Sequence, residues 1–106
     1  MQTNGWDMTL HICACVVTVF LVAAANGANA ADGQAVYNQD CALCHNAMSP
    51  KLGDKAAWAP LIKEGTPALV ASTTKGKGAM PARGGHADLS DADAKAAVEY
   101  MESQSQ

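Results

Sequence analysis

The apolar and polar positions divide the chain into two parts. No charged residue lies between Leu10 and Ala25, whereas all seven Lys and Arg residues come later in the chain. The apolar run is shorter than the roughly twenty residues that a membrane-spanning helix needs. The small residues that follow it, up to Ala30, stand where a signal peptidase reads them. The pattern therefore predicts a signal peptide over 1–30, cleaved after Ala30, with a retained membrane anchor as the alternative.

The remaining segment, 31–106, is expected to begin with a helix. Asp32 is a favourable N-cap residue for it. The apolar positions that follow recur at helical spacing on one face, and they are Val36, Tyr37, Cys41 and Cys44. This helix is therefore expected to carry both cysteines.

The stretch after that helix is expected to be mostly irregular. Pro50 and Gly53 disfavour a helix and indicate a loop over 46–53. Pro60 interrupts the short apolar segment around Trp58, so no long regular element is expected there. Loops of this length in a small domain suggest that the chain wraps around something.

A second helix is predicted over 68–75. Thr66 is expected to be its N-cap, with Pro67 at the first helical position and Gly76 at its end. The next segment, 76–85, has too many Gly and Pro residues for a helix and lacks the alternation of a strand. It is expected to be a loop.

The last helix is expected to begin after Ser90, which can cap it together with Asp93. Asp91 and Lys95 are spaced to form an ion pair on its outer face. Its inner face is predicted to consist of Leu89, Ala94, Ala97, Val98 and Met101. Since no strand pattern is present, the predicted fold class is all-α, with three to four short helices joined by long loops.

Composition and charge constrain the domain further. Loss of 1–30 leaves 76 residues (106 minus 30), and a domain of this size usually needs a metal, a disulfide or a cofactor as a staple. Asp7, Cys13 and Cys15 leave with the first segment, so nine acidic residues face seven basic ones. The resulting formal charge of −2 (7 minus 9) argues against nucleic acid as a partner.

The strongest motif is Cys41-Ala-Leu-Cys44-His45, the c-type haem attachment sequence. In such a motif each thiol adds to a haem vinyl group, and the histidine becomes a ligand of the iron. Positions i, i+3 and i+4 of a helix share one side, so this spacing directs both sulfurs and the imidazole together. A strained disulfide, or a zinc site that adds His86, is the alternative for these residues.

A second axial ligand of the iron would come from one of three methionines. Met101 lies on the predicted core face of the last helix, which is the usual place of a buried methionine. Met48 follows His45 too closely for its side chain to reach the opposite face of a porphyrin. Met80, in a loop and followed by Pro81, remains as the predicted ligand. The alternative is an open or otherwise filled sixth position.

These motifs resemble those of cytochrome c5, within the class I c-type cytochromes. The segments that carry the likeness span nearly all of 31–106, and they are Cys41–His45, Pro50–Asp54, Trp58, Gly76–Pro81 and Gly84–Gly85. The resemblance implies an all-helical cytochrome c-type fold, one covalently attached haem c with its iron, and electron transfer in the bacterial periplasm. Gly33, Tyr37 and Tyr100 match the two crossing helices of these cytochromes, where glycine allows close approach and the aromatic rings fill the crossing.

The resemblance also implies roles for two haem contacts. The Pro50 carbonyl would accept a hydrogen bond from the far nitrogen of His45 and fix the orientation of its ring. Trp58 would approach a haem propionate or serve as a core indole, and the two roles do not exclude each other. The segment 46–49 is shorter than the family pattern, so the covering of that haem edge is expected to differ.

The expected function is that of a small soluble mono-haem electron carrier in the periplasm. No nucleophile with a base, phosphate loop or carboxylate pair stands out, so no enzymatic activity is predicted. With His45 and Met80 both bound, the iron has no open position for a substrate. The expected partners are membrane-bound or periplasmic oxidoreductases that form brief complexes. The alternatives are a haem domain that binds or senses a small ligand after Met80 is displaced, and a secreted zinc module.

Basic residues gather around Met80 in the sequence. Lys75, Lys77 and Arg83 flank it, and no acidic residue lies between positions 66 and 87. These bases could form a rim that steers an acidic partner, or they could be merely solvated loop residues.

Overall fold

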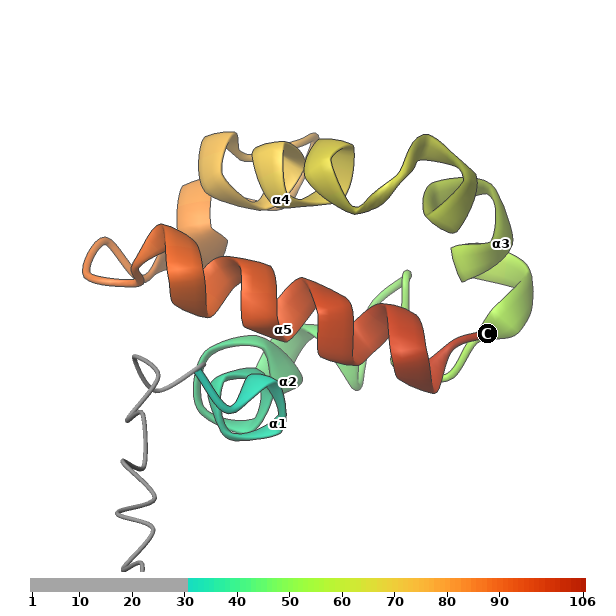
Figure 1. Ribbon diagram of the computed structural model, residues 1–106, viewed down its shortest axis with the longest axis horizontal. Coiled ribbons are helices and arrows are strands. Elements are labelled where there is room, and N and C mark those ends of the chain that lie inside the picture. The colour runs from blue at the N-terminus through green and yellow to red at the C-terminus, as the bar shows by residue number, and fades with distance from the viewer. Residues whose placement is uncertain (1–30) are drawn as a thin grey trace, which may run out of the picture.

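The computed structural model describes residues 31–106, and the predicted signal peptide lies outside them. The elements in chain order are α1 (Gly33–Val36), η1 (Tyr37–Cys41), α2 (Ala42–His45), α3 (Lys55–Glu64), α4 (Thr66–Lys75), η2 (Ala82–Gly85) and α5 (Asp91–Gln104). No strand occurs in this part of the chain, so the predicted all-α class is confirmed. Figure 1 shows α5 running through the middle of the domain, with α4 on one side and α1 and α2 on the other.

The elements α1, η1 and α2 follow one another without a break and carry the Cys-x-x-Cys-His motif. Asp32 Oδ1 caps the start of α1 by accepting from two backbone N–H groups, at 3.1 and 3.3 Å. The middle element, Tyr37–Cys41, is a π-helix, in which the Ala42 N–H bonds to the Tyr37 carbonyl. The predicted first helix is confirmed. Its π turn, a feature often found at functional sites, was not indicated by the spacing of apolar residues.

This helical segment crosses α5 at Gly33. A methyl group on Gly33 would overlap the Ala96 carbonyl, so only glycine lets the two backbones come this close. The rings of Tyr37 and Tyr100 pack beside it, with centroids 5.5 Å apart and planes tilted by 47°. The buried Tyr37 also donates its hydroxyl hydrogen to Asn46 Oδ1 at 2.6 Å. The helix crossing that the cytochrome resemblance implies is therefore present.

Helix α5 supplies half of the buried hydrophobic residues in the part of the chain that the structure describes. Ser90 caps it by accepting from the Asp93 N–H at 3.0 Å and donating to the Asp93 carboxylate at 2.7 Å. All residues of the predicted inner face are buried, namely Leu89, Ala94, Ala97, Val98 and Met101. The sequence therefore predicted both the start and the buried face of this helix.

The ion pair predicted on the outer face of α5 is wrong. Lys95 pairs with Glu99 at 2.9 Å, one turn later in the same helix. Asp91 is bound at 2.7 Å by Arg83, which comes from the preceding loop. Asp91 thus pairs with Arg83 instead of Lys95. Helical spacing alone could not indicate this contact, because Arg83 lies outside the helix.

The middle of the chain is more regular than predicted, because α3 spans Lys55–Glu64. Asp54 caps this helix by accepting from the Ala57 N–H at 3.1 Å, and the helix continues through Pro60. The proline lacks one backbone donor, while the buried indole of Trp58 holds the segment against the core. The prediction that no long element forms here is therefore wrong.

Helix α4 begins at Thr66, the residue that was predicted to be its N-cap. Its N-cap is Gly65, which has a φ of 91°, and Thr66 is already helical. The Thr66 hydroxyl donates to Glu102 Oε2 on α5 at 2.9 Å instead of capping α4. The predicted end is confirmed, because Gly76 leaves the helix with a φ of 83°.

The C-terminus is fixed to the loop that precedes α3. Ser105 is buried, and its hydroxyl oxygen accepts a hydrogen bond from the Gly53 N–H at 2.9 Å. The two residues are 52 positions apart in the sequence. This contact closes the domain at the end of α5.

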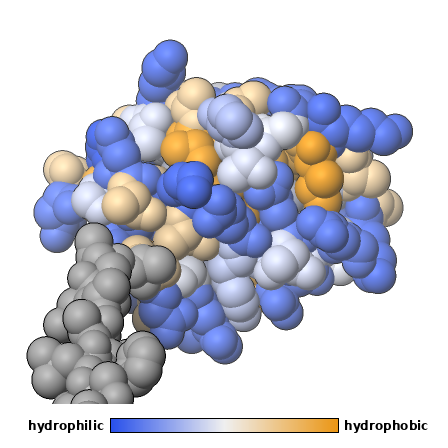
Figure 2. All heavy atoms as spheres, viewed as in Figure 1, coloured by the Kyte–Doolittle hydropathy of each residue, from blue (hydrophilic) through white to orange (hydrophobic). Residues whose placement is uncertain are grey.

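The surface is mostly polar on the face that Figure 2 shows, and apolar residues form small separate groups on it. Among the residues described, the large hydrophobic side chains that remain exposed are Leu43 and Met48. No helix within 31–106 is long and apolar enough to cross a membrane.

Candidate haem site

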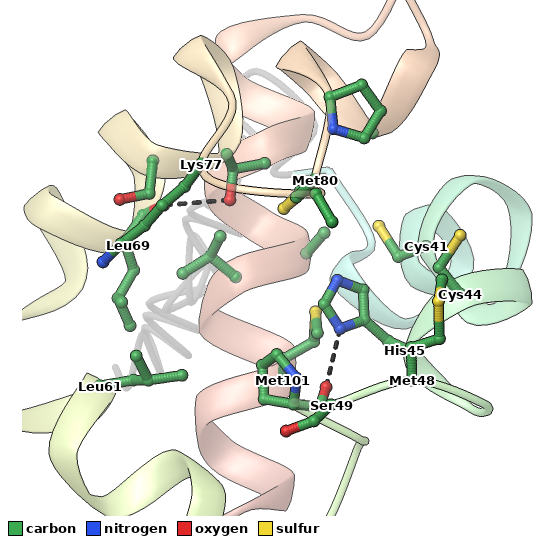
Figure 3. Close-up of a pocket in the computed structure, with 18 of the residues that line it drawn as sticks. Cys41, Cys44, His45, Met48, Ser49, Leu61, Leu69, Lys77, Met80 and Met101 are labelled. Carbon is green, nitrogen blue, oxygen red and sulfur yellow. Dashed lines mark hydrogen bonds between the residues drawn. The ribbon is translucent and has the colours of Figure 1, made fainter.

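A cavity of about 390 Å³ lies between the motif-bearing segment, α3, α4, α5 and the loop that contains Met80. This volume falls in the range of cofactor and small-molecule sites. Its walls are largely apolar, and the large side chains that form them are Trp58, Leu61, Leu69, Val98 and Met101. Figure 3 shows residues of this lining, with Cys41, Cys44 and His45 grouped on one side.

The motif residues reach the cavity from one short stretch of helix. Cys41 is half-buried, Cys44 is exposed, and both are free thiols. His45 Nδ1 donates to the Pro50 carbonyl oxygen at 2.8 Å, which is the hydrogen bond that the resemblance implies. Because Nδ1 carries the proton in this bond, Nε2 of the neutral ring has a free lone pair. The histidine is thus oriented and in the tautomer that a metal ligand needs.

Cys41 lies in the more buried part of the motif. Burial, and in smaller measure the nearby Asp40 and Cys44, raises the pKa of its thiol to about 11. The neutral thiol is therefore the favoured form at pH 7. An uncharged sulfur suits a wall of an apolar cavity.

Met80 enters the same cavity from a tight turn after α4. Its backbone N–H and carbonyl both bond to Lys77, at 3.0 Å each. Gly76 starts this turn in a left-handed conformation, and a Cβ there would lie 2.8 Å from the Ala82 nitrogen. The turn therefore fixes the backbone at Met80, whose half-buried side chain lines the cavity.

The other two methionines lie as the sequence indicates. Met101 is buried on α5, 4% exposed, where it forms part of the core and of the cavity wall. Met48 lines the cavity next to the motif but is 58% exposed. Figure 3 shows Met48 on the His45 side and Met80 on the loop above the imidazole.

The remaining predictions at this site have mixed outcomes. Trp58 is buried and lines the cavity, so its core role is confirmed. Its indole N–H donates to the Lys51 carbonyl at 2.8 Å, and an approach of the ring to a haem propionate stays a prediction. Sequence reasoning missed Leu61 and Leu69 as wall residues, because apolar positions on short helices do not distinguish a core contact from a cofactor contact.

The zinc and disulfide alternatives find no support in the described residues. Within 31–106 no group of three or more His, Cys, Asp or Glu side chains is placed to hold a metal ion. His86 faces Asp40, with Nδ1 3.5 Å from Oδ1, rather than the two cysteines. Both cysteines are free rather than joined.

Two of the three basic residues around Met80 have an acidic partner. Lys77 lies 3.7 Å from Glu64, the last residue of α3. Arg83 donates to the Leu89 carbonyl at 2.6 Å and is ion-paired with Asp91. These partners are Glu64, at the end of α3, and Asp91, at the start of α5.

Comparison with known proteins identifies the family. The family model described as cytochrome c oxidase, cbb3-type, subunit III matches residues 28–101. The protein named cytochrome c-555 from Chlorobaculum tepidum is 44% identical in an alignment of 107 positions that covers 92% of this chain and 99% of its own length. Cytochrome c5 from Azotobacter vinelandii is 39% identical in an alignment of 80 positions that covers 71% of this chain and 96% of its own. The chain belongs to the class I c-type cytochromes, close to cytochrome c5.

Solved structures agree with this assignment. The cytochrome in a crystal structure of an electron transfer complex of nitrite reductase with cytochrome c has a TM-score of 0.67 and 46% identity, covering 71% of this chain and 95% of its own. A mono-haem ferrocytochrome c from Shewanella putrefaciens has a TM-score of 0.59 and 40% identity, covering 71% and 95%. The chain is therefore a small mono-haem cytochrome c that carries electrons, with one covalently bound haem c and its iron.

The residues of the cavity fit this cofactor. Two free thiols and an oriented imidazole stand together at one wall, and a thioether lines the cavity from another element. Most of the remaining wall is hydrocarbon, which suits the apolar ring of a porphyrin. The donor set of S, S and N with a thioether S is that of c-type haem attachment with His and Met ligands.

Proposed function

We propose that this cytochrome is a periplasmic electron carrier in which Cys41 and Cys44 hold the haem and His45 and Met80 are the axial ligands of its iron. The observation that carries the proposal is the shared cavity. His45, oriented by Pro50 at 2.8 Å, and Met80, fixed by its turn, line it from different elements. When bound, the haem supplies a one-electron iron couple.

The residues of the chain have separate roles in this proposal. Each cysteine S–H adds across a vinyl group, which fixes the cofactor and staples a small core. The Pro50 carbonyl holds the His45 ring and increases its basicity. The Met80 thioether is a weak donor that favours the reduced iron and so raises the potential. With both axial positions taken, electron exchange without substrate binding is the activity we propose, and no enzymatic reaction.

A spectrum and a mass of the purified protein test the ligand assignment. We expect a mass increased by one haem that denaturation does not remove, and a weak near-infrared sulfur-to-iron band in the ferric protein. The band should vanish in Met80→Ala and persist in the matched variant Met48→Ala. A spectrum of an open or bis-histidine site in the unaltered protein would overturn the ligation.

We also propose export to the periplasm with cleavage after Ala30. The support is the uncharged run from Leu10 to Ala25 followed by small residues. The intact mass tests this proposal, because cleavage gives a chain that starts at Ala31. A membrane-bound product that retains 1–30 would show that the segment is an anchor.

The partners we propose are periplasmic or membrane-bound oxidoreductases. The similar cytochrome in the nitrite reductase complex supports this class of partner. Stopped-flow mixing of the reduced protein with a nitrite reductase would test it. Oxidation at a rate that saturates with enzyme concentration is expected, and a rate no faster than with free small oxidants would contradict it.

A further inference from the structure

A histidine outside the haem motif lies directly behind one wall of the haem cavity. His86 follows η2, and its Nδ1 is 3.5 Å from Oδ1 of Asp40 in η1. Asp40 lines the cavity, and so does Gly84. A Cβ on Gly84 would lie 3.9 Å from His86 Cδ2, so the ring lies next to this second wall residue as well. His86 is therefore separated from the cavity by only one layer of residues.

The two partners of this contact differ in their access to solvent. The Asp40 side chain is 13% exposed, whereas the His86 side chain is 43% exposed. Burial is the main cause of the raised pKa of the Cys41 thiol, and Asp40 is the second cause. The charge of Asp40 therefore acts on a residue of the haem motif, since a partly buried charge is only weakly screened. The His86 ring, by contrast, can exchange protons with water.

Asp40 is the ionisable side chain that contacts the His86 ring in the part of the chain that the structure describes. The other ionisable groups on its own loop and on the neighbouring η1, α4 and α5 are Cys41, Lys75, Arg83, Asp88, Asp91 and Asp93. Within 31–106, no ion pair or side-chain hydrogen bond joins any of these to the imidazole. Arg83 is held by the Leu89 carbonyl and Asp91. The charge on His86 is therefore balanced mainly by Asp40.

We infer that His86 binds a proton from water when the haem iron gains an electron, so that this cytochrome couples proton uptake to its reduction. Reduction removes one positive charge from the cavity, so a positive charge on the nearby ring meets less repulsion. In the protonated ring both nitrogens carry hydrogen, and the Nδ1–H faces Asp40 Oδ1.

The charges of this step balance. The electron comes from the redox partner and the proton from water, so the net charge of the protein does not change. Histidine is the side chain that ordinarily titrates between pH 5 and 8, so the coupling is expected in that range. The inference goes beyond the proposed function, because it requires only that a haem in this cavity gains and loses one electron.

Two measurements on the mature holoprotein test the inference, namely voltammetry at a series of pH values and NMR titration of the His86 ring. The ring should bind its proton about two- to fivefold more tightly in the reduced than in the oxidised protein. The reduction potential should therefore fall as the pH rises through the titration of His86. His86→Gln should remove this part of the pH dependence and keep the visible spectrum.

Gln34→His is the matched control, because Gln34 is exposed and does not line the cavity. The histidine added there should titrate at the same pH in both redox states. A redox-dependent titration at this position would show that the effect does not depend on the place of His86 behind the cavity wall, which would overturn the inference.

The carboxyl groups of the haem are the competing source of a redox-linked titration. A pH dependence of the potential that His86→Gln leaves unchanged would assign the coupling to them and overturn the inference. Equal proton binding by the His86 ring in the two redox states would overturn it as well, and this measurement needs no substitution. Asp40→Asn should move the titration of His86 to lower pH in both states, and no movement would contradict the role of this carboxylate.

Discussion

The crossing of α1 with α5 and the mouth of the haem cavity lie in the same small domain but are built in opposite ways. At the crossing, backbone packs against backbone at Gly33, two tyrosine rings meet, and the Tyr37 hydroxyl has its partner. At the mouth, by contrast, Leu43 and Cys44 are exposed to solvent. At the crossing, protein atoms fill all the contacts. At the mouth of the cavity, side chains are left for contact with groups that are not part of the chain.

The difference shows that a domain of this size divides its apolar residues between a protein core and the walls of a cofactor cavity. The crossing of α1 with α5 is packed by protein atoms alone, whereas another face of α5 lines the cavity. The cavity walls are apolar too, yet they face the cofactor, so part of the stability of the folded protein depends on the haem. Changes in the cavity should therefore act first on haem content and potential, and changes at the crossing first on unfolding.

The largest effect should come from the two motif cysteines. Replacement of both in Cys41→Ala, Cys44→Ala removes both thioether bonds, so we expect less than about a tenth of the normal yield of haemoprotein. Haem absorbance per milligram of periplasmic extract measures this yield. The matched control is Cys13→Ala, Cys15→Ala, in the predicted signal peptide, which should leave the yield unchanged. Normal red protein from the motif variant would refute covalent attachment at these positions.

Removal of Met80 should change the iron without removing the haem. In Met80→Ala we expect the reduction potential to fall by on the order of 0.1 V or more, within the range of about 0.8 V that axial ligands span, and we expect carbon monoxide to bind. Voltammetry and a carbon monoxide difference spectrum measure the two effects. If Met48→Ala gave the same shifts and Met80→Ala none, the ligand assignment would move to Met48.

A methyl group at the crossing should lower stability instead. Gly33→Ala forces the helices apart because its Cβ overlaps the Ala96 carbonyl, and overpacking of this kind costs about 1–3 kcal/mol. Denaturant unfolding followed by circular dichroism measures the loss, with Gln34→Ala as the neighbouring control. The potential should stay nearly constant. A shifted potential with unchanged stability would contradict the separation between the two regions.

The smallest effect concerns the alkaline limit of stability. Burial, followed by Cys41 and Tyr100, raises the pKa of Tyr37 above its usual 10.0. The folded protein thus favours the neutral phenol of Tyr37. The stability that this preference adds is fully present below pH 10, and it is lost as the pH rises through the pKa of Tyr37 in the folded protein. Tyr37→Phe removes the hydrogen bond to Asn46, so its free energy of unfolding at pH 7 should be lower by about 1 kcal/mol. Above pH 10, however, the free energy of unfolding of this variant should fall less than that of the unaltered protein.

Asn46→Ala is the matched variant for this last prediction. It removes the same hydrogen bond but keeps the phenol, so it should retain the alkaline decline. Unfolding free energies at pH 8 to 11 would show the two behaviours. Parallel pH curves for both variants would mean that another group sets the alkaline limit.

Local signals in the sequence predicted the ends of the fold better than its middle. Asp32 and Ser90 cap their helices through side-chain contacts within three residues, and such contacts can be inferred from sequence. Helix α3 was missed because Pro60 weighed against it, while the burial of Trp58 that favours it depends on distant residues. Tertiary contacts of Trp58 thus outweighed the tendency of Pro60 to interrupt the helix.

The site divides in the same way. The motif lies within five residues, so its arrangement on one helix side could be predicted from its spacing, whereas its hydrogen bond to Pro50 was implied by the family resemblance. The neutralisation of Lys77 by Glu64 brings together the end of one helix and the loop after another. No spacing rule predicts that contact, so the sequence alone could not decide between a steering rim and solvated loop residues.

The bond between Ser105 and Gly53 has a practical consequence for attaching this cytochrome to an electrode or another protein. Ser105 is 1% exposed and is tied to the loop between the haem motif and α3. A tag or linker joined at Gln106 would pull on that loop and so on the wall that orients His45. An exposed side chain such as Gln34, on the helix that starts the domain, offers an anchoring point that leaves this tie in place.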